Sequence, residues 1–307
     1  MAYNSYRAYG LRIDAEIACP ELQPDPHPDG EPDVTVRLLP AVESVSETVA
    51  NGFYEVQPEV FRMTVPGVGQ YLVEQGSRIS IEPLANAHID EVRLFLLGSS
   101  MGALLYQRGL FPLHGSAIET KWGAMIFVGT QGAGKSTLAA QFHHRGYRLL
   151  SDDICAVACT PEGLRALPAV AQFRLCSDAY ERIGAPQQAR FDVDKFVVPM
   201  GDGYCTQPVE LKAIHILCNH EQREPQFTLL RGFDRVQQLL ENLYRPHYLK
   251  GQNTQSDLMR MAGLIAQKCT MVSVTRNRDA SAIDAMIGFL EGAWTKEFGL
   301  VPELEKR

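Results

Sequence analysis

"GTQGAGKST", residues 129–137, lies within the longer stretch FVGTQGAGKSTLAAQFHHRGYRLLSDD, residues 127–153. It fits the phosphate-binding pattern G-x-x-x-x-G-K-[ST] at every fixed position. An apolar run precedes it, and a helix-forming run closed by Gly146 follows it. A strand, a glycine-rich turn and a helix in this order are the context in which the pattern binds nucleotide phosphates. We therefore expect an α/β fold in which residues 129–137 form a P-loop.

The P-loop side chains have distinct expected contributions. Gly132 and Gly134 allow backbone N–H groups to converge on phosphate oxygens, and the helix N-terminus adds partial positive charge. Lys135 is expected to neutralise the β and γ phosphates, and Ser136 to offer its hydroxyl to Mg²⁺. The guanine-specifying N-K-x-D pattern is missing from the sequence, so ATP is the expected nucleotide. The expected nucleotide-binding residues are Gly129, Thr130, Gln131, Gly132, Ala133, Gly134, Lys135, Ser136 and Thr137.

Two adjacent carboxylates, Asp152 and Asp153, close the strand-like run that follows the P-loop helix. In an open parallel sheet, ligands bind beyond the carboxyl ends of the strands, so we expect both carboxylates at the phosphate site. Neighbouring strand residues point to opposite faces, which predicts that one carboxylate approaches the metal and the other the acceptor. The alternative is a pair of turn residues in solvent.

The rest of the chain divides into three expected parts. Short alternating runs separated by Gly, Pro and Asn predict a β-rich N-terminal domain over residues 1–88, built on an antiparallel sheet. Apolar residues at helical spacing predict a linking helix over 89–111. Strands alternating with helices predict an α/β kinase-type domain over 112–307.

Composition excludes several classes of function. The chain has 307 residues and a formal net charge of −7, which disfavours a nucleic-acid partner. No apolar run has the length of a membrane span, and the N-terminus does not have the pattern of a signal peptide, so we expect a cytoplasmic protein without a membrane partner. Seven scattered cysteines lack zinc-site or disulfide spacing and are expected to be free thiols.

Three segments together resemble a known family: LHGSAIE around His114, the P-loop with Lys135 and Ser136, and RGYRLLSDD ending in Asp153. Their order and spacing are similar to those of bacterial HPr kinase/phosphorylase, a P-loop group akin to ATP-dependent phosphoenolpyruvate carboxykinase. The resemblance implies an HPr kinase/PEP carboxykinase-like domain over residues 112–307, with ATP and Mg²⁺ as cofactors. It also implies that Asp153 takes the proton of a substrate serine, that His114 positions or tunes Asp153, and that Lys135 binds the phosphates. Ser136 and Asp152 are the expected ligands of Mg²⁺.

The chain departs from the HPr kinase pattern in two places. Lys135-Ser136 is followed by Thr137 instead of Glu, and the second family signature, a Glu-Ile-Arg-Gly run, has no counterpart. More of the chain resembles the lasso-peptide precursor kinases, through YRAYGLRIDAEIACPEL, ALPAVAQFRLCSDAYERI and NLYRP. That subgroup phosphorylates the C-terminal serine of a precursor peptide.

Two cations that flank the expected active-site half, Arg174 and Lys195, are candidates for contacting the γ-phosphate or a peptide carboxylate. Solvated surface charges are the alternative for both.

Three hypotheses for the function follow from these patterns. The first is a serine kinase acting on a precursor peptide, and the second is a serine kinase/phosphorylase of the small phosphocarrier protein HPr. The third is an ATP-binding regulator without catalysis. The acceptor is therefore expected to be a peptide or a phosphocarrier, and the sequence leaves open whether the protein forms a homo-oligomer.

Overall fold

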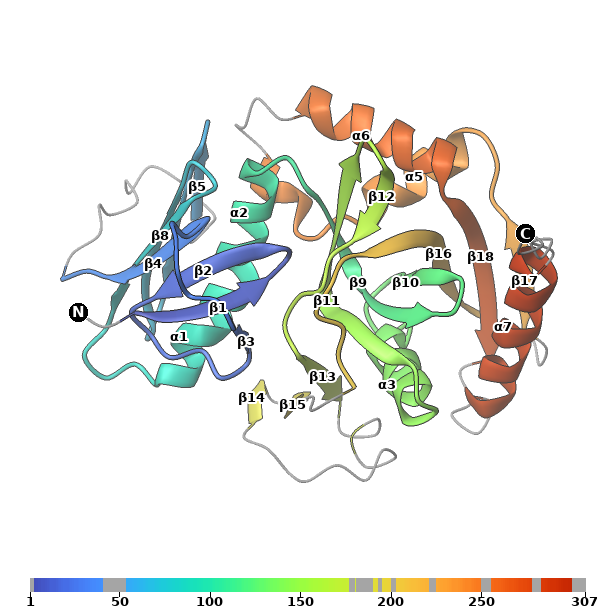
Figure 1. The fold of residues 1–307 in the computed structure, drawn as a ribbon, viewed down its shortest axis with the longest axis horizontal. Helices are drawn as coiled ribbons and strands as arrows, with labels where there is room; N and C mark the ends of the chain where they lie inside the picture. Colours follow the sequence, from blue (N-terminus) through green and yellow to red (C-terminus); the bar gives the residue numbers. More distant parts are fainter. Residues whose placement is uncertain are drawn as a thin grey trace.

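The computed structural model describes residues 3–40, 54–176, 180, 190–192, 195–199, 203–220, 225–249, 255–277 and 283–299. Within them, the strands form an eight-stranded, a seven-stranded and a three-stranded sheet. The N-terminal sheet lies at one end of the molecule and helix α7 (Ile283–Phe298) at the other (Figure 1). Helices α1 and α2 lie between the two large sheets (Figure 1).

The N-terminal sheet has the strand order β3-β1-β2-β4-β8-β7-β6-β5. Its pairs are not all antiparallel, because β4 runs parallel to both β2 and β8. The prediction of an antiparallel sheet was therefore wrong at its centre. Parallel neighbours need a longer connection than a hairpin, and the chain between β2 and β4 supplies one. The strands are β1 (Asn4–Ala8), β2 (Leu11–Ala15), β3 (Gln23–Pro24), β4 (Val34–Leu38), β5 (Tyr54–Gln57), β6 (Val60–Val65), β7 (Gly69–Glu74) and β8 (Arg78–Pro83).

The predicted helix after this sheet is present. It comprises α1 (Ile89–Phe95), a π-helical segment η1 (Leu96–Ser100) and α2 (Met101–Gln107). Its apolar side is buried, as the helical spacing predicts, and includes Val92, Leu96, Met101, Leu104 and Leu105. The π-helical turn falls at Gly98, and such turns occur often at functional sites.

The seven-stranded sheet carries the P-loop. Its order is β10-β9-β11-β12-β16-β18-β17, and β10 also pairs with β16. The strands β9, β11, β12, β16 and β10 therefore close into a ring instead of forming an open parallel sheet. The strands are β9 (Phe111–Thr120), β10 (Gly123–Val128), β11 (Arg148–Thr160), β12 (Gly163–Ala166), β16 (Val209–His220), β17 (Gln226–Leu229) and β18 (Thr270–Asn277).

Three further groups of elements surround this sheet. The P-loop helix α3 (Lys135–His144) contacts β9 and α7. Helices α5 (Phe233–Glu241) and α6 (Gln255–Lys268) pack together, and the 3₁₀ turn η2 (Pro246–Leu249) lies between them in the chain. The small sheet consists of β13 (Gln172–Cys176), β15 (Lys195–Pro199) and β14 (Arg190–Asp192).

A buried aromatic cluster fixes α3 and α7 against the sheet. Trp294 of α7 is fully buried and stacks on Phe142 of α3, with ring centroids 5.2 Å apart. Its indole N–H donates to Nε2 of His215 at 2.8 Å. Burial lowers the pKa of His215 to about 3, so this imidazole is neutral and acts as an acceptor. The pair satisfies two polar groups that would otherwise be costly inside the core.

The described part of the chain also gives the state of the cysteine side chains and the character of the helices. Six of the seven cysteines, Cys19, Cys155, Cys159, Cys205, Cys218 and Cys269, are free thiols, and the side chain of Cys176 lies outside the described residues. Among the residues that the structure describes, none of the helices combines the length and apolar character needed to span a lipid bilayer.

Candidate functional site

The P-loop connects β10 to α3, as the sequence predicts. Gly129, Gly132 and Gly134 have φ values of 145°, 79° and 86°. A Cβ on Gly129 would lie 2.6 Å from the carbonyl oxygen of Leu217, so glycine is required where the loop passes β16. The loop leads into the first turn of α3, whose N–H groups form an anion-binding site. Of the remaining predicted nucleotide-binding residues, Thr130, Gln131 and Ala133 lie in the loop, and Thr137 lies in the first turn of α3.

Lys135 begins α3, and its side chain is held at the loop. The residue is only 7% exposed, and its ammonium donates to the carbonyl oxygens of Gly129 at 2.9 Å and Thr130 at 3.3 Å. Because its position is fixed over the loop, the positive charge is placed where phosphate oxygens would bind.

Asp152 is buried beside the P-loop. Its Oδ1 accepts from the hydroxyl of Ser116 at 2.6 Å, and its Oδ2 accepts from the backbone N–H of Arg174 at 2.9 Å. Ser136 of the P-loop donates a further hydrogen bond to this carboxylate. Burial raises the pKa of Asp152, although these hydrogen bonds oppose the shift.

The pair Asp152 and Ser136 fits a Mg²⁺ ion. In the part of the chain that the structure describes, no group of three or more His, Cys, Asp or Glu side chains could hold a metal. Mg²⁺ does not require such a group, because it binds through one or two carboxylates together with water and substrate phosphates. One carboxylate and one P-loop hydroxyl in hydrogen-bond contact are therefore sufficient protein ligands.

Asp153 lies between His114 and Arg174. Its Oδ1 is 3.3 Å from Nδ1 of His114, and its Oδ2 is 3.6 Å from Nη1 of Arg174. The His114 ring also lies 3.2 Å from the carbonyl oxygen of Asp153. The carboxylate is 19% exposed, so it is accessible while being fixed by two neighbours. The structure thus brings together three residues that the sequence placed in separate segments.

The position of the two carboxylates in their strand differs from the prediction. They lie inside β11, which continues to Thr160 and pairs antiparallel with β9, instead of at the carboxyl end of a strand in a parallel sheet. Asp153 has a φ of 78°, a left-handed conformation that is unusual for a residue other than glycine. The two side chains have different surroundings, as alternation predicts, but Arg174 contacts both of them.

A cleft of about 900 Å³ joins these groups. The P-loop residues Gly129, Thr130 and Gln131 line it together with His114, Asp153 and Arg174. The opposite wall comes from α5 and the segment after it, and includes Gln238, Glu241, Asn242, Tyr244 and Arg245. A nucleotide on the P-loop would therefore place its phosphates in the same space as Asp153.

Tyr244 and Arg245 were missed by the sequence analysis as site residues. The Arg245 guanidinium donates to the hydroxyls of Tyr244 at 3.3 Å and Tyr248 at 3.2 Å. The backbone of Arg245 has a φ of 46°. The Tyr244 ring packs on α2 at Gly102, where a Cβ would lie 2.7 Å from the ring. The segment NLYRP was noticed only as a resemblance, because nothing in its sequence indicates that it reaches the P-loop.

The two candidate cations have different outcomes. Arg174 of β13 contacts Asp153, so it is not a solvated surface charge. Lys195 begins β15, the strand paired with β13, but its side chain lies outside the described residues. A role for Lys195 in binding phosphate or substrate stays a prediction.

No protein-family model matches the chain, and no curated protein matches it. Among solved structures, the chain is similar to the HPr(Ser) kinase/phosphatase from Coxiella burnetii. That alignment covers 61% of this chain and 97% of that chain, with 12% sequence identity and a TM-score of 0.33. Similarity of this degree does not assign a reaction, so the function has to be inferred from the side chains around the P-loop.

Proposed function

We propose that the protein is an ATP- and Mg²⁺-dependent kinase that transfers the γ-phosphoryl group to a hydroxyl. The observation that carries this proposal is the carboxylate of Asp153, which faces the cleft of the P-loop between His114 and Arg174. Phosphoryl transfer requires mainly alignment, neutralisation of charge and a carboxylate that orients the attacking hydroxyl. A nucleotide-binding regulator would have no need for the last of these groups.

The transfer follows from these positions. Asp153 accepts the proton of the acceptor hydroxyl while the hydroxyl oxygen forms a bond to the γ-phosphorus. The bond from the γ-phosphorus to the β–γ bridging oxygen breaks, and ADP leaves with that electron pair. Lys135 and Arg174 neutralise charge on the transferred group, and His114 holds the carboxylate of Asp153 in place. Mg²⁺, held through Ser136 and Asp152, would supply further charge neutralisation on the β and γ phosphates.

We assign a peptide serine as the acceptor, and specifically the C-terminal serine of a lasso-peptide precursor. The support is positional, because all three segments that resemble the precursor kinases border the site. Residues 6–22 contribute Tyr9 and Glu21 to a pocket that Asp153 also lines, and residues 166–183 contribute Arg174. Residues 242–246 contribute Arg245 to the cleft.

The test is a phosphorylation assay with Mg·ATP and three acceptors. These are a short peptide ending in serine, the same peptide ending in alanine, and the phosphocarrier HPr. We expect mass spectrometry to show one added phosphoryl group on the serine peptide alone. If HPr alone were phosphorylated, the acceptor would be a phosphocarrier protein and the assignment of a peptide acceptor would be wrong. Tight binding of ATP with no transfer to any acceptor would contradict the kinase assignment.

A further inference from the structure

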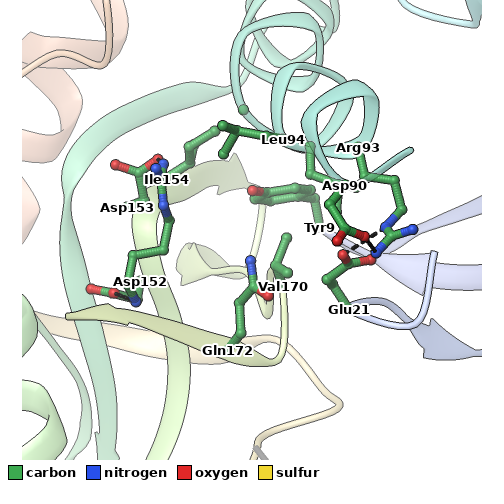
Figure 2. A pocket seen from close by; sticks show the side chains of 13 residues that line it. Tyr9, Glu21, Asp90, Arg93, Leu94, Asp152, Asp153, Ile154, Val170 and Gln172 are labelled. Carbon is green, nitrogen blue, oxygen red and sulfur yellow. Dashed lines mark hydrogen bonds and ion pairs between the residues drawn. The ribbon is translucent and has the colours of Figure 1, made fainter. Parts of the chain in front are cut away.

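A second, smaller pocket adjoins the cleft at Asp153 and Arg174, which line both spaces. Figure 2 shows Asp152 and Asp153 on one wall and Tyr9, Glu21 and Arg93 on the facing wall. Its volume is about 40 Å³, against about 900 Å³ for the cleft. Such a volume holds roughly three water-sized groups, so the pocket suits one small chemical group and not a whole nucleotide.

The pocket is formed by parts of the chain that are far apart in sequence. Tyr9 has a φ of 56° in the turn between β1 and β2, and its backbone N–H donates to the carbonyl oxygen of Pro168 at 2.6 Å. The carbonyl oxygen of Glu21 accepts from Ala171 N–H at 3.2 Å. The π-helical segment adds Gly98 as a further lining residue. These two hydrogen bonds thus fix Tyr9 and Glu21 against the segment 168–171, which leads into β13 and Arg174.

Three polar atoms buried in the residues that line this pocket have no hydrogen-bond partner. Two are acceptors, Oε2 of Glu21 and Oε1 of Gln172, and one is a donor, Nε of Arg174. A buried polar group without a partner is destabilising, so native structures rarely retain such groups without a purpose. Two acceptors and one donor among the lining residues correspond in kind to the N–H and C=O groups of a peptide unit.

Charge in the pocket determines which way such a peptide would lie. Four carboxyl groups line it, those of Glu21, Asp90, Asp152 and Asp153, against the two guanidinium groups of Arg93 and Arg174. Arg93 is already paired with Glu21 at 2.7 Å and with Asp90. The excess of carboxylates favours hydrogen-bond donors of a ligand and disfavours an anionic group. The C-terminal carboxylate of the acceptor peptide is therefore expected in the wide cleft, where Arg245 lies.

We infer that this pocket is the acceptor subsite and that it binds the backbone amide next to the reacting serine. Glu21 and Gln172 accept the N–H donors of the acceptor, and Arg174 donates to its carbonyl oxygen. The inference rests on the proposed kinase function and deepens it, because it makes Glu21 and Gln172 determinants of acceptor specificity outside the nucleotide site.

Binding measurements separate this inference from the kinase assignment. The dissociation constant of a serine-terminated peptide is measured by calorimetry with a non-hydrolysable ATP analogue and Mg²⁺, so that no transfer is needed. Glu21→Gln removes the negative charge and replaces one of the two acceptor oxygens by an NH₂ donor, so it is expected to weaken peptide binding about 10-fold or more. Gln172→Met removes a neutral acceptor and is expected to weaken it about 5-fold. Binding of the ATP analogue alone should not change.

A matched control and a modified peptide exclude a merely structural effect. Gln70 also has a buried Oε1 without a partner, but it lies on β7 and is not among the residues that line the pocket. Gln70→Met should therefore leave peptide binding unchanged, while melting temperatures report any loss of stability for each variant. A peptide with an N-methylated serine lacks the N–H donor, so it should bind the wild-type protein more weakly than the parent peptide does. The Glu21→Gln variant should bind the two peptides with equal affinity.

Three results would overturn the inference. They are wild-type affinity in both pocket variants, equal binding of parent and N-methylated peptides to the wild-type protein, and no binding of the parent peptide to the wild-type protein. If the parent peptide binds as expected but no phosphoryl group is transferred, the subsite assignment stands and the kinase assignment fails.

Discussion

Replacing Asp153 by asparagine separates the chemistry at this position from its backbone strain. The residue has a φ of 78°, and asparagine is one of the few side chains that tolerate the left-handed region. Alanine would add about 1–2 kcal/mol of conformational cost there, so its effect on activity would be confounded with folding. Asparagine keeps the shape and one acceptor oxygen, but it cannot take a proton from the acceptor hydroxyl.

The expected loss follows from the contacts of the carboxylate. A positioned general base contributes about 10²–10⁴-fold, which corresponds to about 2.7–5.5 kcal/mol of transition-state stabilisation. The two contacts of the carboxylate, at 3.3 Å to His114 and 3.6 Å to Arg174, involve partly exposed groups, so their loss should cost about 1 kcal/mol or less of stability. ATP affinity should fall less than the transfer rate, because both of these contacts are made to residues outside the P-loop.

The assay compares single-turnover transfer rates, ATP affinity and melting temperature for wild type and Asp153→Asn. Asp257→Asn is the control, because Asp257 is an exposed residue of α6 whose ion pair, to Arg260, lies on the same helix. A wild-type transfer rate in Asp153→Asn would show that Asp153 is not the base. A parallel loss of ATP affinity would place its role in nucleotide binding instead of proton transfer.

Three further substitutions test the P-loop and its carboxylate. Lys135→Ala should lower ATP affinity at least about 10-fold in a calorimetric titration, because it removes the cation held over the loop. An unchanged affinity would exclude Lys135 from phosphate binding. Asp152→Asn should abolish Mg²⁺-dependent transfer yet raise the melting temperature. Burial raises the pKa of Asp152, so its ionisation destabilises the fold, and the advantage of asparagine should grow as the pH rises from about 4. A constant difference from pH 4 to pH 8 would contradict this. Gly129→Ala should lower the melting temperature by several degrees more than Gly132→Ala does. Of the two added Cβ atoms, only the one at position 129 would clash with the backbone, because it would lie 2.6 Å from the carbonyl oxygen of Leu217. Equal losses would mean that the loop can move away from β16.

The proposed acceptor subsite would give the N-terminal sheet a role beyond stability. The turn at Tyr9 and the residue Glu21 reach the space beside Asp153, while β4, β5 and β8 lie at the far end of the molecule from α3 (Figure 1). Variation in residues 6–22 should therefore change which acceptor is phosphorylated without changing how ATP is bound.

The sequence by itself determined the local parts of this protein. A strand, a glycine turn and a helix around Lys135 are set by short-range backbone preferences, so the pattern of residues 129–137 was sufficient to predict them. The linking helix was predictable for the same reason, because its apolar spacing is a property of one segment. The pairing of Asp153 with His114 followed from a resemblance and is present at 3.3 Å.

Only the tertiary structure decided how these parts combine. The closed ring of strands, the antiparallel pairing of β11 and the left-handed Asp153 depend on contacts between distant segments, which leave no periodic signal in the chain. Arg245 reaches the cleft because Tyr244 packs on Gly102, and Glu21 reaches the acceptor pocket because its carbonyl oxygen is bonded to Ala171. Long-range packing of this kind fixes the substrate half of the site, whereas local sequence fixes the phosphate half.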